Sequence, residues 1–265
     1  MQNFEDLRHY ETCVFACSGP SLNKVDPFSL GFPVVAISTA IRKIKNPNYW
    51  VYSDYLNEMH GEEGKQAYVD DSITKIIQDG KSTSHLKSNN LKIYLCEKTN
   101  RDYDIKKVFK PDTPYVKGPH KSITFGIQWA HSIGVKNIIF AGNDLRAESM
   151  ETKYCYAVNS IDMKKKHNFK RTLDEVESYL QNWYPVAQSL GFNWYSWECG
   201  SAFESFVPKF TEDVYNKLLK KEFVTTKPIA IQEQPSEEIS LPDEPNQMQK
   251  DIHTYMRLMN RVKKL

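Results

Sequence analysis

Short runs of consecutive apolar residues, each closed by small or polar residues, constrain the fold of this chain most strongly. The clearest strand is predicted over Asn137-Ile-Ile-Phe-Ala141, where four apolar residues in a row are followed by Gly142. A continuous apolar run, without alternation, is typical of a strand that is buried on both faces of a parallel sheet. Similar runs predict further strands over residues 13–17, 33–37, 49–52, 92–96 and 192–196.

Segments with helical spacing of apolar residues lie between these runs. They predict helices over residues 62–80, 122–132, 172–190 and 211–222, and we expect a long polar loop over 97–119. The alternation of strands and helices predicts an α/β fold, a Rossmann-like, doubly wound and mostly parallel sheet.

The chain has a different composition after residue 224. We expect residues 1–224 to form the Rossmann-like domain. Residues 225–245 are rich in Pro, Glu, Gln and Ser and bury little, which predicts a flexible linker. Residues 246–265 have the spacing of a basic amphipathic helix, on which an oligomer contact or a partner protein could dock.

Charge and composition exclude some classes of protein. The 35 Lys and Arg residues nearly balance the 33 Asp and Glu residues, which argues against a general polyanion binder but allows a local basic patch. No apolar run approaches the roughly 18 residues that span a bilayer, and the N-terminus lacks a signal-peptide core, so we expect a cytoplasmic protein without a membrane span. Five scattered cysteines favour reduced thiols over disulfides or a zinc site.

Small, hydroxylated and acidic residues recur where four predicted strands end. They are Ser18-Gly19-Pro20-Ser21, Ser38-Thr39, Ser53-Asp54 and Gly142-Asn143-Asp144. In open parallel sheets, ligands bind outside the carboxyl ends of the strands. We therefore expect Ser18, Ser38, Asp54 and Asp144 to share one crevice that accepts an activated phosphoester.

Each group suits a particular chemistry, and each also has an ordinary structural explanation. Gly19 allows backbone N–H groups to approach a phosphate, and Ser18 and Ser21 add hydroxyl donors, although an ordinary turn has the same composition. Asp54 could hold a ribose or a metal, or simply cap the strand end. We favour a functional role for Asp144, because a Gly-Asn-Asp run beside the core contributes little to stability.

Two basic segments favour an anionic ligand. Lys121 and Ser122 open the helix predicted over 122–132, whose free N–H groups attract an anion; Ser122 also suits a plain N-cap. Residues 164–171 are basic and contain His167, which could act as a general base. This run could steer an anionic substrate, contact a nucleic-acid backbone, or form a solvated loop.

The strand-end motifs together resemble a known group of proteins. Val14-Phe-Ala-Cys-Ser-Gly-Pro-Ser-Leu22 resembles the opening of glycosyltransferase family 42, the sialyltransferases. It is also similar to the related domain of motility accessory factors and of archaeal hydroxymethylpterin pyrophosphokinases. The segments 34–42, 49–54, 121–145 and 193–202 resemble the later strands and turns of that domain, so the similarity covers roughly residues 12–205.

This resemblance implies a Rossmann-like domain that holds a nucleotide or nucleotide sugar between the Ser18–Ser21 turn, Ser38, Asp54, Ser122 and Asp144. It also implies that no metal is required. The chain departs from the sialyltransferases in three places. Ser38 stands where they usually have Asn, Leu145 and Arg146 follow the acid where they carry Tyr, and His167 lies closer to Asp144 than their general base does.

The sequence therefore predicts a glycosyltransferase that moves a sugar from a nucleotide-activated donor to a hydroxyl acceptor. Asp144 or His167 would accept the hydroxyl proton, and Lys121 would stabilise the departing phosphate. The acceptor could be a glycan, a protein or, for a bacteriophage enzyme, a modified DNA base.

Two alternatives stay open. One is a pyrophosphokinase with Mg²⁺ at Asp54 and Asp144. The other is a non-catalytic nucleotide-binding adaptor that works through its C-terminal helix.

Overall fold

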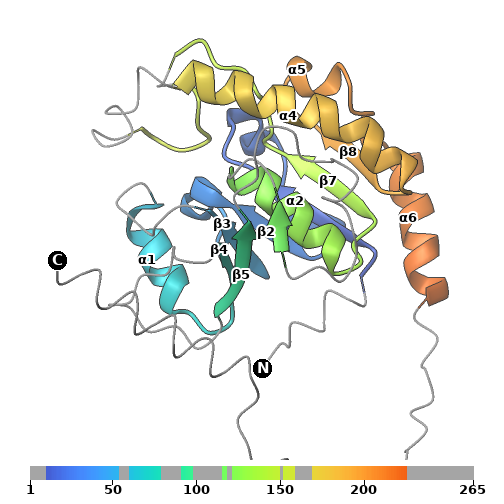
Figure 1. Cartoon of the computed structure of the whole chain (residues 1–265), viewed down its shortest axis with the longest axis horizontal. Helices are drawn as coiled ribbons and strands as arrows, with labels where there is room; N and C mark the ends of the chain where they lie inside the picture. The colour runs from blue at the N-terminus through green and yellow to red at the C-terminus, as the bar shows by residue number, and fades with distance from the viewer. Residues whose placement is uncertain are drawn as a thin grey trace, which may run out of the picture. The chain divides into compact units, whose positions relative to one another are not determined.

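The protein folds around a sheet of eight strands that are all paired in parallel (Figure 1). The computed structural model describes residues 10–53, 60–78, 91–97, 115–117, 121–149, 152–158 and 169–225. The strand order is β6-β5-β4-β3-β2-β1-β7-β8, so the chain builds outward from β1 to one edge and then returns to extend the other side. This order is that of a doubly wound, Rossmann-like fold.

The strands are β1 (Thr12–Ala16), β2 (Val34–Ile37), β3 (Tyr49–Tyr52), β4 (Thr74–Gln78), β5 (Leu91–Glu97), β6 (Tyr115–Lys117), β7 (Asn137–Ala141) and β8 (Asn193–Trp197). The α-helices are α1 (Gly61–Val69), α2 (Ser122–Ser132), α4 (Phe169–Ser189), α5 (Ser201–Glu204) and α6 (Glu212–Thr225). The 3₁₀ turns are η2 (Pro20–Lys24), η3 (Pro27–Leu30) and η4 (Ser38–Arg42).

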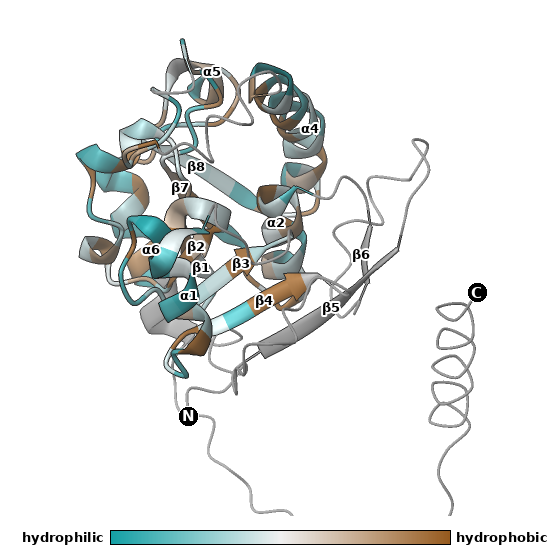
Figure 2. Cartoon of the chain, turned by 90° about the vertical axis from the view of Figure 1, so that its left-hand side faces the viewer, coloured by the Kyte–Doolittle hydropathy of each residue, from teal (hydrophilic) through white to brown (hydrophobic). Residues whose placement is uncertain are grey.

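Helices cover both faces of the sheet. Figure 2 shows α2 and α4 on one face and α1 and α6 on the other. The buried side chains form two matching clusters, one containing residues of α2, α4 and α5 and the other residues of α1, η4 and α6. Parallel strands joined by right-handed crossovers place helices in this way when the chain reverses its direction of growth across the sheet.

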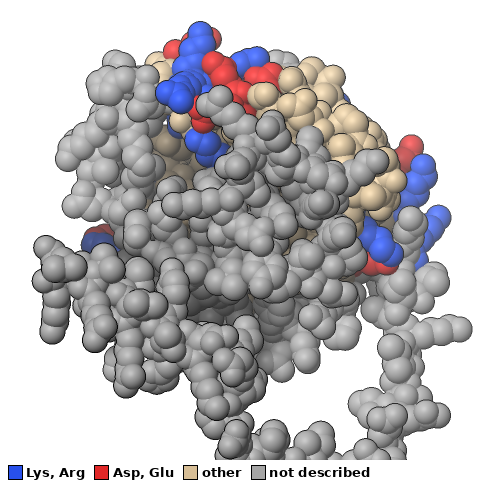
Figure 3. All heavy atoms as spheres, in the orientation of Figure 1, with Lys and Arg blue, Asp and Glu red and all other residues tan. Residues whose placement is uncertain are grey.

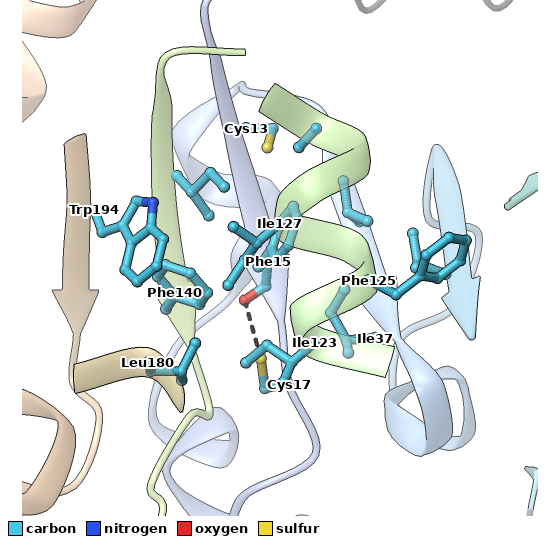
Figure 4. Close-up of a cluster of buried hydrophobic side chains, with 14 of the residues drawn as sticks. Cys13, Phe15, Cys17, Ile37, Ile123, Phe125, Ile127, Phe140, Leu180 and Trp194 are labelled. Atoms are coloured by element: carbon cyan, nitrogen blue, oxygen red, sulfur yellow. Dashed lines mark hydrogen bonds between the residues drawn. The ribbon is translucent and has the colours of Figure 1, made fainter. Parts of the chain in front are cut away.

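The cluster under α2 and α4 is centred on β1 and β7. Phe15 and Phe140 meet edge to face with ring centroids 5.6 Å apart, and Trp194 of β8 lies 5.7 Å from Phe140 (Figure 4). All three side chains are fully buried. This packing holds β1 and β7 in register, because alternate residues of each strand point into the same apolar layer.

The six predicted strands are confirmed to within one or two residues, as β1, β2, β3, β5, β7 and β8. Two strands were not expected. The helix predicted over 62–80 is wrong beyond Val69: the chain turns at Asp70, whose carboxylate accepts a hydrogen bond from the Ser72 N–H at 2.8 Å, and continues as β4. The loop predicted over 97–119 contains the short edge strand β6.

The predicted helices over 122–132, 172–190 and 211–222 correspond to α2, α4 and α6. The predicted linker and C-terminal helix lie outside the described residues, apart from Thr225, with which α6 ends. None of the helices in the described ranges is long and apolar enough to cross a membrane. Cys13, Cys17, Cys155 and Cys199 are not joined by disulfides.

Candidate functional site

The winding of the chain changes direction between β1 and β7, and the turns after these strands lie together. Cys17 N–H donates to the Ala141 carbonyl at 2.7 Å, and Gly19 N–H donates to the Gly142 carbonyl at 2.8 Å. Ser21 N–H donates to Asp144 Oδ2 at 2.9 Å. The turn after β1 is thus hydrogen-bonded directly to the loop after β7 at the switch point, where ligands of such sheets bind.

Both turns need glycine for this close approach. A Cβ on Gly19 would lie 2.5 Å from the Gly142 carbonyl oxygen and would collide with the Asp144 carboxylate. Gly142 has a φ of +72°, and a Cβ there would lie 2.5 Å from the Cys17 carbonyl oxygen. The backbones of the two turns are therefore in contact in a way that larger residues would prevent.

A cavity of about 520 Å³ opens beside these turns, at the carboxyl ends of β1, β2 and β7. Its polar wall contains Ser18, Gly19, Ser38, Thr39, Gly142, Asn143 and Asp144. The remaining lining comes from the start of α2, from α4 and from the chain after β7: Lys121, Ser122, Leu145, Arg146, Lys153, Tyr154, Phe169, Thr172, Leu173 and others. The volume is typical of a site for a small molecule.

Asn143 carries a buried polar side chain among the residues that line the cavity. The residue is only 5% exposed, and its Nδ2 atom has no hydrogen-bond partner among the residues that the structure describes. A buried N–H donor without a partner costs about 1–3 kcal/mol. Asn143 also lines the cavity, so an acceptor group that reached this amide would recover that cost.

Backbone strain gathers at the same strand ends. Ser38, which follows β2, has a φ of +51°, and Leu145, which follows Asp144, has a φ of +58°. Residues other than glycine rarely adopt this left-handed region, which costs of order 1 kcal/mol or more and clusters at functional sites. Both residues line the cavity.

Cations surround the cavity, and two of them are paired with carboxylates of α4. Lys121 Nζ lies 3.0 Å from Glu175 Oε2, and Arg146 bridges Asp174 at 3.1 Å and Glu177 at 2.7 Å. Figure 3 shows basic and acidic side chains intermingled over the beginning of α4. The lining itself contains three basic residues, Lys121, Arg146 and Lys153, and one acid, Asp144, and the first two basic residues are already paired with α4 carboxylates.

Ser122 joins the start of α2 to the end of β3. Its Oγ accepts a hydrogen bond from Ser53 N–H at 3.1 Å, and the two hydroxyls lie 3.2 Å apart. This contact places the N-terminus of α2, with its positive dipole end, beside the cavity.

The thiols near Asp144 are not nucleophiles. Burial, the Asp144 carboxylate and the neighbouring thiols raise the pKa of Cys17 well above its usual value. Burial is also the main cause that raises the pKa of Cys155 and of Cys199 to about 11. A protonated thiol at neutral pH is a poor nucleophile, so the chemistry of this site belongs to its oxygen and nitrogen groups.

Nine of the predicted site residues line the one cavity: Ser18, Gly19, Ser38, Thr39, Lys121, Ser122, Gly142, Asn143 and Asp144. Two do not. Pro20 is exposed, and Ser21 is buried behind the turn, where its N–H orients Asp144. Asp54 and His167 lie outside the described residues.

Sequence reasoning did not single out Lys153, Tyr154, Phe169 or Leu173 as lining residues. The rule that ligands bind outside the carboxyl ends of parallel strands does not select these residues. Phe169 and Leu173 are four residues apart, and this spacing marks one face of α4 without indicating that the face meets a cavity.

Among the residues that the structure describes, no group of three or more His, Cys, Asp or Glu side chains is arranged to hold a metal ion. Asp54, one of the two acids that the pyrophosphokinase alternative assigns to Mg²⁺, is not among those residues.

No protein-family model and no curated protein matches this chain. Among solved structures, a MAf glycosyltransferase from Magnetospirillum magneticum AMB-1 is similar to it, with a TM-score of 0.42 and 15% sequence identity. The match covers 82% of this chain and 37% of that protein, so this chain spans little more than a third of the neighbour's length. At this level of similarity, the function has to be inferred from the site itself.

Proposed function

We propose that the protein is a glycosyltransferase whose nucleotide-activated sugar donor binds in the cavity at the β1/β7 switch point. The observation that carries the proposal is the unpartnered, buried Asn143 amide in a cavity bounded by a glycine turn and a helix N-terminus. A phosphoester satisfies all three features, because its oxygens accept hydrogen bonds and its charge suits the dipole of α2.

The proposal gives a role to the polar and basic residues that line the cavity. Asn143 and the Ser18 hydroxyl donate hydrogen bonds to the donor phosphate or ribose. Lys121, together with the start of α2, stabilises the negative charge that develops on the departing phosphate. Lys121 is held in place by Glu175, which keeps its ammonium group at the mouth of the cavity.

Asp144 is the general base in this proposal. Its Oδ2 atom is fixed by the Ser21 N–H, so the carboxylate has a defined orientation at the cavity wall. Asp144→Asn keeps an oxygen that can accept the Ser21 hydrogen bond but removes the basic group. We expect turnover to fall by about 10²–10⁴-fold while donor binding stays within a few fold. If Asp144→Asn keeps its turnover, the base lies elsewhere, and His167→Gln is the next variant to test.

A thermal-shift panel of nucleotides and nucleotide sugars tests the proposal directly. A ligand at 100 times its Kd stabilises the folded state by about 2.7 kcal/mol, which raises the Tm of a domain of this size by about 5–10 °C. Asn143→Asp should abolish the shift, since it replaces the donor with a carboxylate that repels phosphate. Ser132→Ala, at the far end of α2, serves as the control. A shift that survives in Asn143→Asp would place the ligand elsewhere.

The panel and the turnover assay are repeated in EDTA. The glycosyltransferase proposed here keeps its activity, whereas the magnesium-dependent pyrophosphokinase alternative loses it. Transfer of a sugar to glycan, protein or DNA acceptors then identifies the acceptor class.

A further inference from the structure

Two tyrosines beside the cavity form a parallel stack. The rings of Tyr154 and Tyr156 have centroids 4.8 Å apart and planes only 10° apart. Behind them, the Arg42 guanidinium carbon lies 3.9 Å from the centre of the Tyr156 ring. Tyr154 lines the cavity, so this three-layer stack ends at the cavity wall.

Hydrogen bonds fix the segment that carries the stack. Cys155 N–H donates to the Ser18 carbonyl at 2.8 Å, and the Asn23 amide donates to the Cys155 carbonyl at 3.0 Å. The Arg42 guanidinium donates to the Ala157 carbonyl at 3.2 Å. The segment 152–158 is therefore attached both to the turn after β1 and to η4, and the Tyr154 ring is held in a defined position without a ligand.

This arrangement puts an aromatic ring next to the part of the cavity that suits a phosphate. The Cys155–Ser18 hydrogen bond joins the residue after Tyr154 to the Ser18–Gly19 turn. Lys153 Nζ lies over the Tyr154 ring, 5.0 Å from its centre, and Lys153 also lines the cavity. A ligand that fits both features carries an anionic group close to a planar ring.

We propose that Tyr154 is the stacking platform for the base of the nucleotide donor, with Tyr156 and Arg42 as positioning residues behind it. This inference rests on the proposed function, because it assigns the base-binding part of the same cavity. Base–aromatic stacking contributes substantial affinity and tolerates any base, since every base has a π-face. Lys153 then pairs with the phosphate of the same nucleotide.

Calorimetric titration of the full chain tests this inference with two kinds of probe. One kind is the four nucleoside monophosphates; the other is ribose 5-phosphate, which has no base. We expect Tyr154→Ala and Tyr154→Leu to weaken the best nucleotide at least tenfold, or about 1.4 kcal/mol, and ribose 5-phosphate less than twofold. Tyr154→Phe keeps the ring and should bind within twofold or threefold of the wild type. Tyr10→Ala removes an exposed tyrosine that does not line the cavity and is the control.

Three outcomes overturn the inference. If Tyr154→Ala weakens both probes equally, or neither, the ring does not hold the base. If its nucleotide Kd is unchanged and only the KM of the acceptor rises, Tyr154 serves the acceptor instead. If the wild-type chain binds no nucleotide at all, the proposed function fails together with this inference. Failure of the inference alone is distinguishable from failure of the proposed function, because only the latter removes nucleotide binding from the wild type.

Discussion

At the scale of single residues, the contact between two turns makes Gly19 the most sensitive position of the site. A methyl group at residue 19 would lie 2.5 Å from the Gly142 carbonyl oxygen, which is backbone and cannot rotate away. We expect Gly19→Ala to destabilise the fold by about 1–3 kcal/mol and to abolish the ligand-induced thermal shift, because the turn must move away from Asp144. Urea unfolding and the thermal-shift assay measure the two effects.

Gly31→Ala is the matched control for Gly19→Ala. Gly31 has a φ of +73°, and a methyl group there would have no atom within 4 Å, so the change costs about 1 kcal/mol of backbone strain without a collision. Stability should fall, but the ligand-induced shift should remain. Equal loss of that shift in both variants would show that global destabilisation, and not the contact with Asp144, is responsible.

His131 couples the stability of the core to pH. Its Nδ1 lies 2.7 Å from the Val135 carbonyl oxygen, and the Trp194 indole donates to its Nε2 at 3.0 Å, so the ring is held in its neutral form. Burial lowers the pKa of His131 to about 4. The unfolded chain takes up this proton near pH 6.5. Between these two values the unfolded state binds the extra proton, so stability falls as the pH decreases.

Urea unfolding of wild type and His131→Gln between pH 4.5 and 7 measures this coupling. One proton corresponds to a slope of about 1.4 kcal/mol per pH unit. We expect the variant to be less stable at pH 7. The slope of its unfolding free energy against pH should be shallower by up to the value that one proton gives. Parallel curves for the two proteins would contradict the prediction, whatever their difference in stability.

At the scale of elements, Ser122 fixes the angle at which α2 meets the sheet. Ser122→Ala removes the hydrogen bond to Ser53 N–H at the end of β3. We expect a loss of about 1–2 kcal/mol, because both serines are buried and the change removes this acceptor of the Ser53 N–H. Ser132→Ala should cost less than about 0.5 kcal/mol, since the Trp129 carbonyl that it contacts also accepts the Ile133 N–H. Chemical denaturation compares the two, and equal losses would refute the prediction.

The elements also show how far sequence patterns determine this fold. β1 and β7 are predictable because a five-residue apolar run is too short for a helix and is closed by glycine or serine. The pattern of β4 is ambiguous, because Ile73, Ile76 and Ile77 lie at spacings of three and four residues, which suit a helix equally well. The turn at Asp70–Ser72 decides between the two, and only its geometry shows that the helix has ended.

The polar wall of the cavity is predictable for a related reason. Once the strands are recognised, the rule that ligands bind at carboxyl ends selects Ser18, Ser38 and Asn143 without knowledge of the strand order. The wall that Tyr154 and Phe169 contribute follows from tertiary packing of the chain after β7, and no local pattern encodes it. The sequence therefore indicates where the polar wall of the cavity lies better than it indicates the rest of the lining.

At the scale of the whole molecule, the described core is confined to the first part of the chain. Both clusters of buried side chains consist of residues between Cys13 and Leu218, and the chain divides into compact units at Lys227–Pro228. We expect a chain that ends at Lys227 to keep its Tm within about 2 °C of the full chain, since about 1 kcal/mol corresponds to 2–4 °C in a domain of this size.

The same truncated chain also separates an enzyme from an adaptor. Among the described residues, Val176 is the last in the chain that lines the cavity. The truncated protein should therefore keep the nucleotide-induced thermal shift and its turnover on a small acceptor. The full-length chain assayed in parallel is the control. A Tm lowered by more than about 4 °C would show that residues 228–265 contribute to the fold. Retained nucleotide binding with no turnover in either chain, and a partner protein lost on truncation, would favour the non-catalytic adaptor over the transferase.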